Sequence, residues 1–164
     1  MSKKSTNQDG IKVKGMFRVQ IVDDPSGKPK VIGDTGWKTN QVTNLGFNQY
    51  LVSSLGGIAG SKQVTHAALG TGGAPAASGT SLAGEVEKRQ AVTAATSSSS
   101  KTVRFTGTFD SANSFVTNTQ NISNIGLFNT SAQTTGTVFA GNTYASSAAA
   151  TNQNVNFTYD IIFS

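Results

Sequence analysis

The chain has 164 residues, of which 36% are hydrophobic and only 13% charged, and it contains no cysteine. This length suits one domain with a sizeable core, and the lack of cysteine excludes a disulfide framework, a thiolate metal site and a cysteine nucleophile. Most of the net charge of +5 belongs to residues 1–40, where eight of the 13 basic side chains stand against four acidic ones, and the rest of the chain is close to neutral.

The N-terminal region is predicted to be a flexible arm followed by a β-hairpin. Residues 1–10 are polar, as in an unpacked arm, and residues 11–164 are predicted to form a single domain. Within residues 11–40, apolar side chains at every second position predict a half-buried strand, with Gly15 a candidate for a β-bulge. Asp23–Gly27 has the residue types of a tight turn, and a second strand is expected at residues 30–40. The outward face of this hairpin is a candidate protein interface formed by Lys12, Lys14, Arg18 and Trp37.

One short helix is predicted at residues 44–56. Asn44 is a suitable N-cap, and Gly56 and Gly57 provide a stop signal. Four apolar residues are spaced to form one face of this helix, which we expect to pack against a sheet; they are Leu45, Leu51, Val52 and Leu55.

A glycine-rich loop is predicted at residues 70–84. Glycine costs backbone entropy in regular structure, and Pro75 lacks a backbone donor, so this segment favours a long shaped loop. Loops of this length inside a domain are usually functional. We therefore expect the loop to fill a subunit interface, with these candidate residues: Gly70, Thr71, Gly72, Gly73 and Pro75.

The remainder of the chain alternates apolar and polar residues in short segments separated by polar turns. Strands are expected at residues 85–96, 102–109, 122–128, 137–144 and 154–163, the last being the clearest. This pattern favours an antiparallel sandwich or barrel. The expected fold is an all-β, antiparallel β-sandwich of jelly-roll or immunoglobulin-like type with one short helix.

The sequence offers few groups for chemistry. His66 is the single histidine, and no G-x-S-x-G motif accompanies it. Glu85 and Glu87 would share one face of a strand, but the adjacent basic residues Lys88 and Arg89 indicate a solvated or interfacial charge cluster. We expect no catalytic residues, no cofactor and no metal, and we do not expect nucleic acid to be a partner, because acidic residues dilute the basic hairpin. No apolar run approaches the ~18 residues that span a bilayer, so no membrane partner is expected.

Several segments together resemble small virion structural proteins of tailed bacteriophages. The segments are the A-L-G-T-G-rich stretch from Ala68, T-V-R-F-T-G-T-F at residues 102–109 and I-S-N-I-G-L-F-N-T at residues 122–130, preceded by T-N-Q-V-T-N-L-G-F-N-Q-Y-L-V at residues 39–52. The resemblance implies a non-enzymatic tail, collar or capsid-decoration subunit.

Such a subunit would be made in the host cytoplasm and located in the virion. Its partners would be major capsid or tail and neck proteins, together with further copies of itself. The alternative is a host-recognition or glycan-binding module of a tail fibre or head fibre.

Overall fold

A computed structural model describes residues 10–24, 27–76, 78–97, 100–133 and 135–164. The expected all-β antiparallel fold is confirmed, with one short helix in the described part of the chain. Residues 1–9 of the expected arm at residues 1–10 lie outside the described residues, as do residues 25–26 of the expected turn. No helix in the described ranges is long and apolar enough to cross a membrane.

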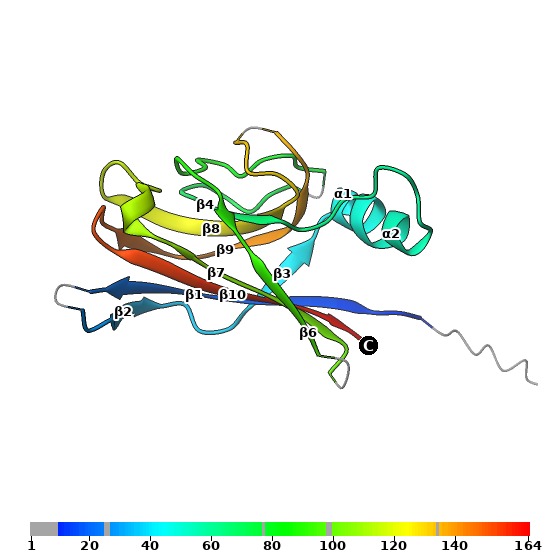
Figure 1. Cartoon of the computed structure of the whole chain (residues 1–164), viewed down its shortest axis with the longest axis horizontal. Coiled ribbons are helices and arrows are strands. Elements are labelled where there is room, and N and C mark those ends of the chain that lie inside the picture. The colour runs from blue at the N-terminus through cyan, green and yellow to red at the C-terminus, as the bar shows by residue number, and fades with distance from the viewer. Residues whose placement is uncertain (1–9, 25–26, 77, 98–99, 134) are drawn as a thin grey trace, which may run out of the picture.

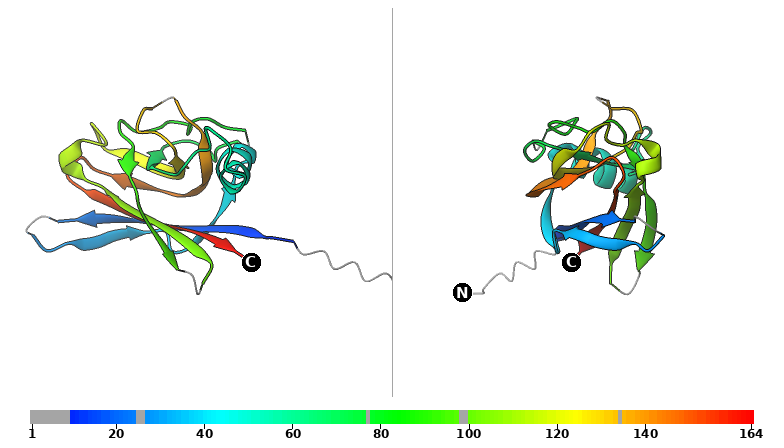
Figure 2. Two further views of the ribbon diagram at one scale, coloured as in Figure 1. Left: turned by 45° about the vertical axis from the view of Figure 1, so that its right-hand side comes forward. Right: turned by 90° about the vertical axis from the view of Figure 1, so that its left-hand side faces the viewer.

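The described strands form two facing layers (Figures 1 and 2). Strand order along the sheet is β5-β4-β8-β9-β3-β1-β10-β7-β6, with β2 pairing to β1 off this path. The first layer contains β1 (Val13–Asp23), β2 (Lys30–Asp34), β6 (Thr93–Ser97), β7 (Thr102–Phe109) and β10 (Asn154–Phe163). The second contains β4 (His66–Gly70), β5 (Gln90–Ala91), β8 (Gln120–Phe128) and β9 (Val138–Ala149). A 3-10 turn, η2 (Ser111–Asn113), follows β7.

Two corners join the layers and nearly close the sheet into a barrel. Strand β3 (Lys38–Val42) pairs with β1 through its first three residues and with β9 through Gln41 and Val42. On the opposite side, β5 pairs with β4 and β6 pairs with β7, so the chain changes layer at Val92. Strands that switch sheets make the corners of such packings. The end-on view in Figure 2 shows the result as a ring of strands around one core.

The core follows the alternation expected for β1 and β10. These strands pair in unbroken register from Val13 opposite Phe163 to Val22 opposite Asn154. Because side chains alternate across a strand, one face of each strand points into the barrel. The buried side chains of that face are Phe17, Val19 and Ile21 of β1 and Val155, Phe157, Tyr159 and Ile161 of β10.

Several expected boundaries are wrong. The strand expected at residues 137–144 is β9, which extends five residues further, to Ala149. The second strand of the N-terminal hairpin is divided into β2 and β3, because the chain turns at Gly36, where φ is +61°. Residues 85–96 are divided into β5 and β6 at the barrel corner. Gly70, the first residue of the expected glycine-rich loop at residues 70–84, is instead the last residue of the buried strand β4.

Gly15 does not form a β-bulge, because it pairs regularly with Ile161. The Asn40 side chain fills the space beside Gly15, and a Cβ atom there would lie 1.5 Å from Asn40 Oδ1. Close packing of β3 on β1 is therefore the reason for this glycine. The irregularity in β1 lies instead between Ile21 and Val22, in the ladder with β2.

The helix extends over residues 44–55 as α1 (Asn44–Gly46), a wider π-helical stretch η1 (Phe47–Val52) and α2 (Ser53–Leu55). Its N-cap is Thr43 rather than Asn44, because the Thr43 hydroxyl accepts a hydrogen bond from Gly46 N at 2.8 Å. Thr43 Oγ1 also donates to Val138 O at 2.5 Å, which fixes the start of the helix to β9.

Candidate functional site

The glycine-rich loop folds back over the outer face of the second layer. Thr71 N donates to Gly84 O at 3.0 Å and Gly72 N to Ala83 O at 3.0 Å, so the base of the loop continues as a hairpin beyond β4. Leu82 is buried in a small core on this outer face, together with Ala68, Phe128 and Val138. The loop is thus part of the chain's own packing.

Polar and steric contacts fix the loop to β8 and β9. Asn124 of β8 is fully buried, and its Nδ2 donates to Gly73 O at 2.9 Å and to Ala83 O at 3.1 Å. Pro75 lies so close to Gly141 of β9 that a Cβ atom at position 141 would be 2.8 Å from Pro75 Cγ. The loop can approach this closely only because β9 has no side chain there.

A buried ion pair holds the end of the loop. Arg89 Nε donates to Glu85 Oε1 at 2.6 Å and Nη2 donates to Glu85 Oε2 at 3.1 Å. The Arg89 side chain is fully buried, and its guanidinium lies 3.6 Å from the centre of the Phe128 ring. Its Nη1 also donates to the backbone carbonyls of Thr130 and Thr135, at 3.3 and 2.9 Å.

The candidate interface residues of the loop therefore have different surroundings. Gly70 and Pro75 are buried inside the chain and offer no surface to another protein, which corrects that expectation for these two positions. Thr71 and Gly73 are exposed, and Gly72 is half-buried. An interface role stays a prediction for residues 71–73.

The candidate residues of the N-terminal hairpin lie on the outer face of the first layer. Lys12 and Lys14 are exposed. Arg18 forms a bidentate pair with Asp34 of β2, with Nη2 to Oδ2 at 2.5 Å and Nε to Oδ1 at 3.0 Å. This pair holds the pKa of the Asp34 carboxyl well below its usual range. The Arg18 guanidinium is thus already paired within its own hairpin.

Trp37 stands at the turn between β2 and β3 and is 43% exposed. The Arg104 guanidinium carbon lies 5.8 Å from the centre of its ring. Arg104 in turn makes two 2.7 Å hydrogen bonds to Asp160. An exposed aromatic ring therefore lies beside a charged pair on this face.

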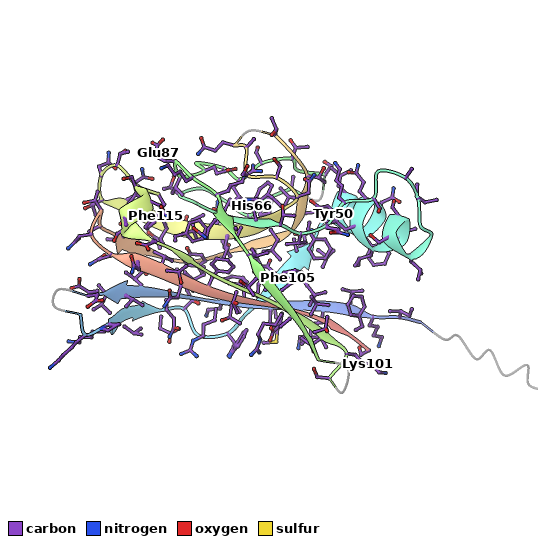
Figure 3. All side chains as sticks on the ribbon, viewed as in Figure 1. Tyr50, His66, Glu87, Lys101, Phe105 and Phe115 are labelled. Atoms are coloured by element: carbon purple, nitrogen blue, oxygen red, sulfur yellow. The ribbon has the colours of Figure 1, made fainter. Side chains whose placement is uncertain are left out.

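His66, the candidate for catalysis that we weighed and set aside, is half-buried at the start of β4 (Figure 3). Its Nδ1 lies 2.9 Å from Thr65 Oγ1. Burial, and next the charge of Arg89, lower the pKa of His66. Glu85 and Glu87 do not share a strand face as expected: Glu85 is held by Arg89, whereas Glu87 is exposed. No cluster of three or more His, Cys, Asp or Glu suited to a metal occurs in the described residues.

The helix and the turn after it expose a patch of apolar side chains that the sequence reasoning missed. We define this helix patch by its four members and their exposed fractions: Phe47 (46%), Val52 (51%), Leu55 (89%) and Ile58 (59%). The expectation that Val52 and Leu55 pack on a sheet is therefore wrong. The helix instead meets the barrel through Gly46, which touches the β9 backbone, and Tyr50, whose hydroxyl donates to Thr137 O.

An apolar groove of about 360 Å³ lies between this helix and the barrel. Figure 3 shows two of its residues, Tyr50 on the helix side and Phe105 on the barrel side. We call it the barrel groove. Its lining includes Tyr50 and Leu51 of the helix, Lys62, Ala94 of β6, Val103 and Phe105 of β7, and Ile161 and Phe163 of β10.

One feature of the sequence indicates that the helix patch is exposed. No charged side chain occurs between Lys38 and Lys62, yet the segment contains more large apolar residues than one helix face can bury. Phe47 and Ile58 fall outside the single face predicted for the helix. A long uncharged segment with surplus apolar residues indicates an interaction surface.

Comparison with known proteins found no matching family model, no matching curated sequence and no matching solved structure.

Proposed function

We propose that this protein is a non-enzymatic structural subunit of a tailed-phage virion, serving as a capsid decoration, collar or tail component. The observation that carries the proposal is the helix patch beside the barrel groove. Large contiguous apolar surfaces on a folded domain mark interaction sites. The sequence resemblance described above supplies the class of assembly.

The architecture supports a role in which the domain is a rigid body. The layers are joined at two corners, and the glycine-rich loop is fixed to the outer face by Asn124 and by the Glu85–Arg89 pair. A subunit repeated in a particle must present its contact residues in one fixed geometry, which rigid elements provide better than mobile loops.

The direct test is to ask whether the protein occurs in particles. Tailed-phage particles from cells that carry the gene would be purified on a density gradient and analysed by quantitative mass spectrometry. We expect the protein to co-sediment with intact particles in a fixed ratio to the major capsid protein. Its restriction to the soluble lysate fraction would refute the proposal.

A second candidate function, glycan binding by a fibre module, is favoured by one observation. Trp37 exposes its ring beside the Arg104–Asp160 pair, and these two charged residues also line a polar depression of about 410 Å³. An amphipathic ring with adjacent hydrogen-bonding groups is a common feature of ligand sites. Binding on a glycan array that Trp37→Ala abolishes would support this function over the first.

A further inference from the structure

We propose that the helix patch and the barrel groove form a two-fold interface, in which each copy of this chain inserts Leu55 and Ile58 into the barrel groove of a second copy. The inference rests on the proposed assembly function and names its first partner as the chain itself. It assigns the contact to one surface out of several that are exposed.

We call Leu55 and Ile58 the ridge; Leu55 is the last residue of α2, and Ile58 lies in the turn that follows. Leu55 is 89% exposed, the highest value among the large apolar side chains of the described residues. Ile58 follows on the next turn, where its backbone N–H donates to Ser53 O at 2.9 Å and so keeps it close to the helix. Two large apolar side chains therefore project from a structured element.

The groove lies on the same side of the molecule as the ridge. Leu51 lines the groove and precedes Leu55 by four residues, a spacing that puts both on one side of a helix. On the opposite wall, Ala94 pairs with Phe105 in the β6–β7 ladder, and both line the groove. A ridge next to a groove on one surface is self-complementary, which is what an isologous two-fold contact requires.

The charge distribution favours a second copy of this chain. No charged side chain lies between Lys38 and Lys62, so two copies can meet here without like charges facing each other across the centre. The charged group in the groove lining is Lys62, whose Nζ donates to Thr137 Oγ1 at 2.5 Å within its own chain. Depletion of charge at the centre is typical of protein interfaces.

The exposed area is sufficient for a stable dimer. The helix patch exposes an apolar area on the order of a few hundred Å², the size at which patches mark interaction sites. A standard interface takes about 800 Å² from each partner, and a little more than half of that is apolar. The patch and the groove lining together supply an area on the order of that apolar share, and polar surface around them would supply the rest.

The test uses the full-length chain in analytical ultracentrifugation at high micromolar concentration. We expect the wild type to sediment at twice the 16.9 kDa chain mass. Leu55→Lys places a charge on the ridge that would face the partner copy's own groove lysine, so we expect this variant to sediment as a monomer. Ile32→Lys is the matched control, because Ile32 is also an exposed apolar residue (49%) but lies on β2, and it should remain dimeric.

A charge-pair rescue tests the ridge-in-groove arrangement itself. Ala94→Glu, a change at an exposed residue of the groove wall, should also give a monomer. In an equimolar mixture of Ala94→Glu and Leu55→Lys, one of the two contacts joins the introduced lysine of one copy to the introduced glutamate of the other. The second contact keeps the wild-type pair, so the dimer should return.

Three results would overturn the inference: a monomeric wild type, a dimeric Leu55→Lys, or a mixture that stays monomeric. None of these results bears on whether the protein is found in particles, so the proposed function can fail or survive separately.

Discussion

Removal of the Glu85 carboxylate should release the glycine-rich loop and strongly destabilise the domain. In Glu85→Ala, the guanidinium of Arg89 stays buried against Phe128 and keeps its contacts with the carbonyls of Thr130 and Thr135. It loses its two hydrogen bonds to the carboxylate and its counter-charge. The folded state is then left with an unpaired buried cation.

The magnitude follows from the burial of the pair. The Arg89 side chain is 0% exposed and that of Glu85 is 8% exposed, so solvent cannot replace the lost partner. Removal of one member of such a buried pair costs about 3–5 kcal/mol. A domain is typically stable by about 5–15 kcal/mol, so this single change should remove a large part of the free energy of unfolding.

Urea denaturation of four proteins measures this effect. Asp34→Ala is the matched control, because the Arg18–Asp34 pair is about a third exposed and its loss should cost at most about 1 kcal/mol. The double variant Glu85→Leu/Arg89→Met removes both charges, and replacement of a buried ion pair by apolar side chains of similar volume is often neutral or stabilising. Its cost is about 1–3 kcal/mol for each of the two carbonyls, Thr130 O and Thr135 O, that stays buried without a donor. It should therefore be more stable than Glu85→Ala alone. Hydrogen exchange at Thr71 and Gly72 should also accelerate in Glu85→Ala.

Two results would show that the Glu85–Arg89 pair does not stabilise the domain in this way. A loss below about 1 kcal/mol for Glu85→Ala would mean that the pair does not behave as a buried one. A double variant less stable than Glu85→Ala would mean that the isolated charge is not the source of the loss.

Three further predictions concern the helix and two titrating groups. Gly46→Ala should lower the free energy of unfolding by about 1–3 kcal/mol in urea titration, because the new Cβ would lie 2.0 Å from Phe139 O; an unchanged or higher stability would contradict the packing of helix on β9. The single histidine, His66, should titrate below pH 6.5 in an NMR titration, because burial lowers its pKa. The unfolded chain then binds more protons than the folded one, so the free energy of unfolding falls as the pH drops through the folded pKa. A titration midpoint of His66 at or above pH 6.5 would contradict its burial. The hydrogen bonds from Arg18 lower the pKa of Asp34, so this carboxylate contributes to the free energy of unfolding above about pH 4, and the contribution is lost as the pH falls through the folded pKa. The melting temperatures of the wild type and Asp34→Asn should therefore converge in acid. A difference in melting temperature that stays constant with pH would count against the ion pair.

Strands with one face in the core were predictable from the sequence. In β10, buried Val155, Phe157 and Tyr159 alternate with more polar neighbours, because only one side of the strand faces the interior. Strand β4 was missed because the glycine-rich loop covers its outer face. Its residues Ala68 and Leu69 are therefore both buried, and no alternation marks the strand.

The helix was predictable as an element, but its orientation was not. A polar cap and a glycine pair delimit it, and these are local signals. Which side faces the barrel depends on contacts distant in sequence: Gly46 against β9 and the Tyr50 hydroxyl on Thr137 O. Leu55 was assigned to the buried face by periodicity alone, and it is the most exposed member of the helix patch.

The glycine-rich segment was predictable as a loop, but its place in the fold was not. Composition indicates irregular structure, but it does not reveal that Leu82 and Pro75 would pack on the outer face of the second layer. Their partners, Phe128 and Gly141, are far away in the sequence. Most of the loop packs on its own chain, whereas the helix patch exposes large apolar side chains. The helix patch is therefore the better candidate for a protein interface.

The most direct test of the account compares particle incorporation of three full-length proteins. Wild type, Leu55→Lys and Ile32→Lys would be supplied to cells producing gene-deleted particles, and gradient-purified particles would be analysed by quantitative mass spectrometry. We expect wild type and Ile32→Lys to enter particles at equal copy number, whereas Leu55→Lys should stay in the soluble fraction as a folded protein. Equal incorporation of Leu55→Lys would contradict the claim that the helix patch is the assembly surface.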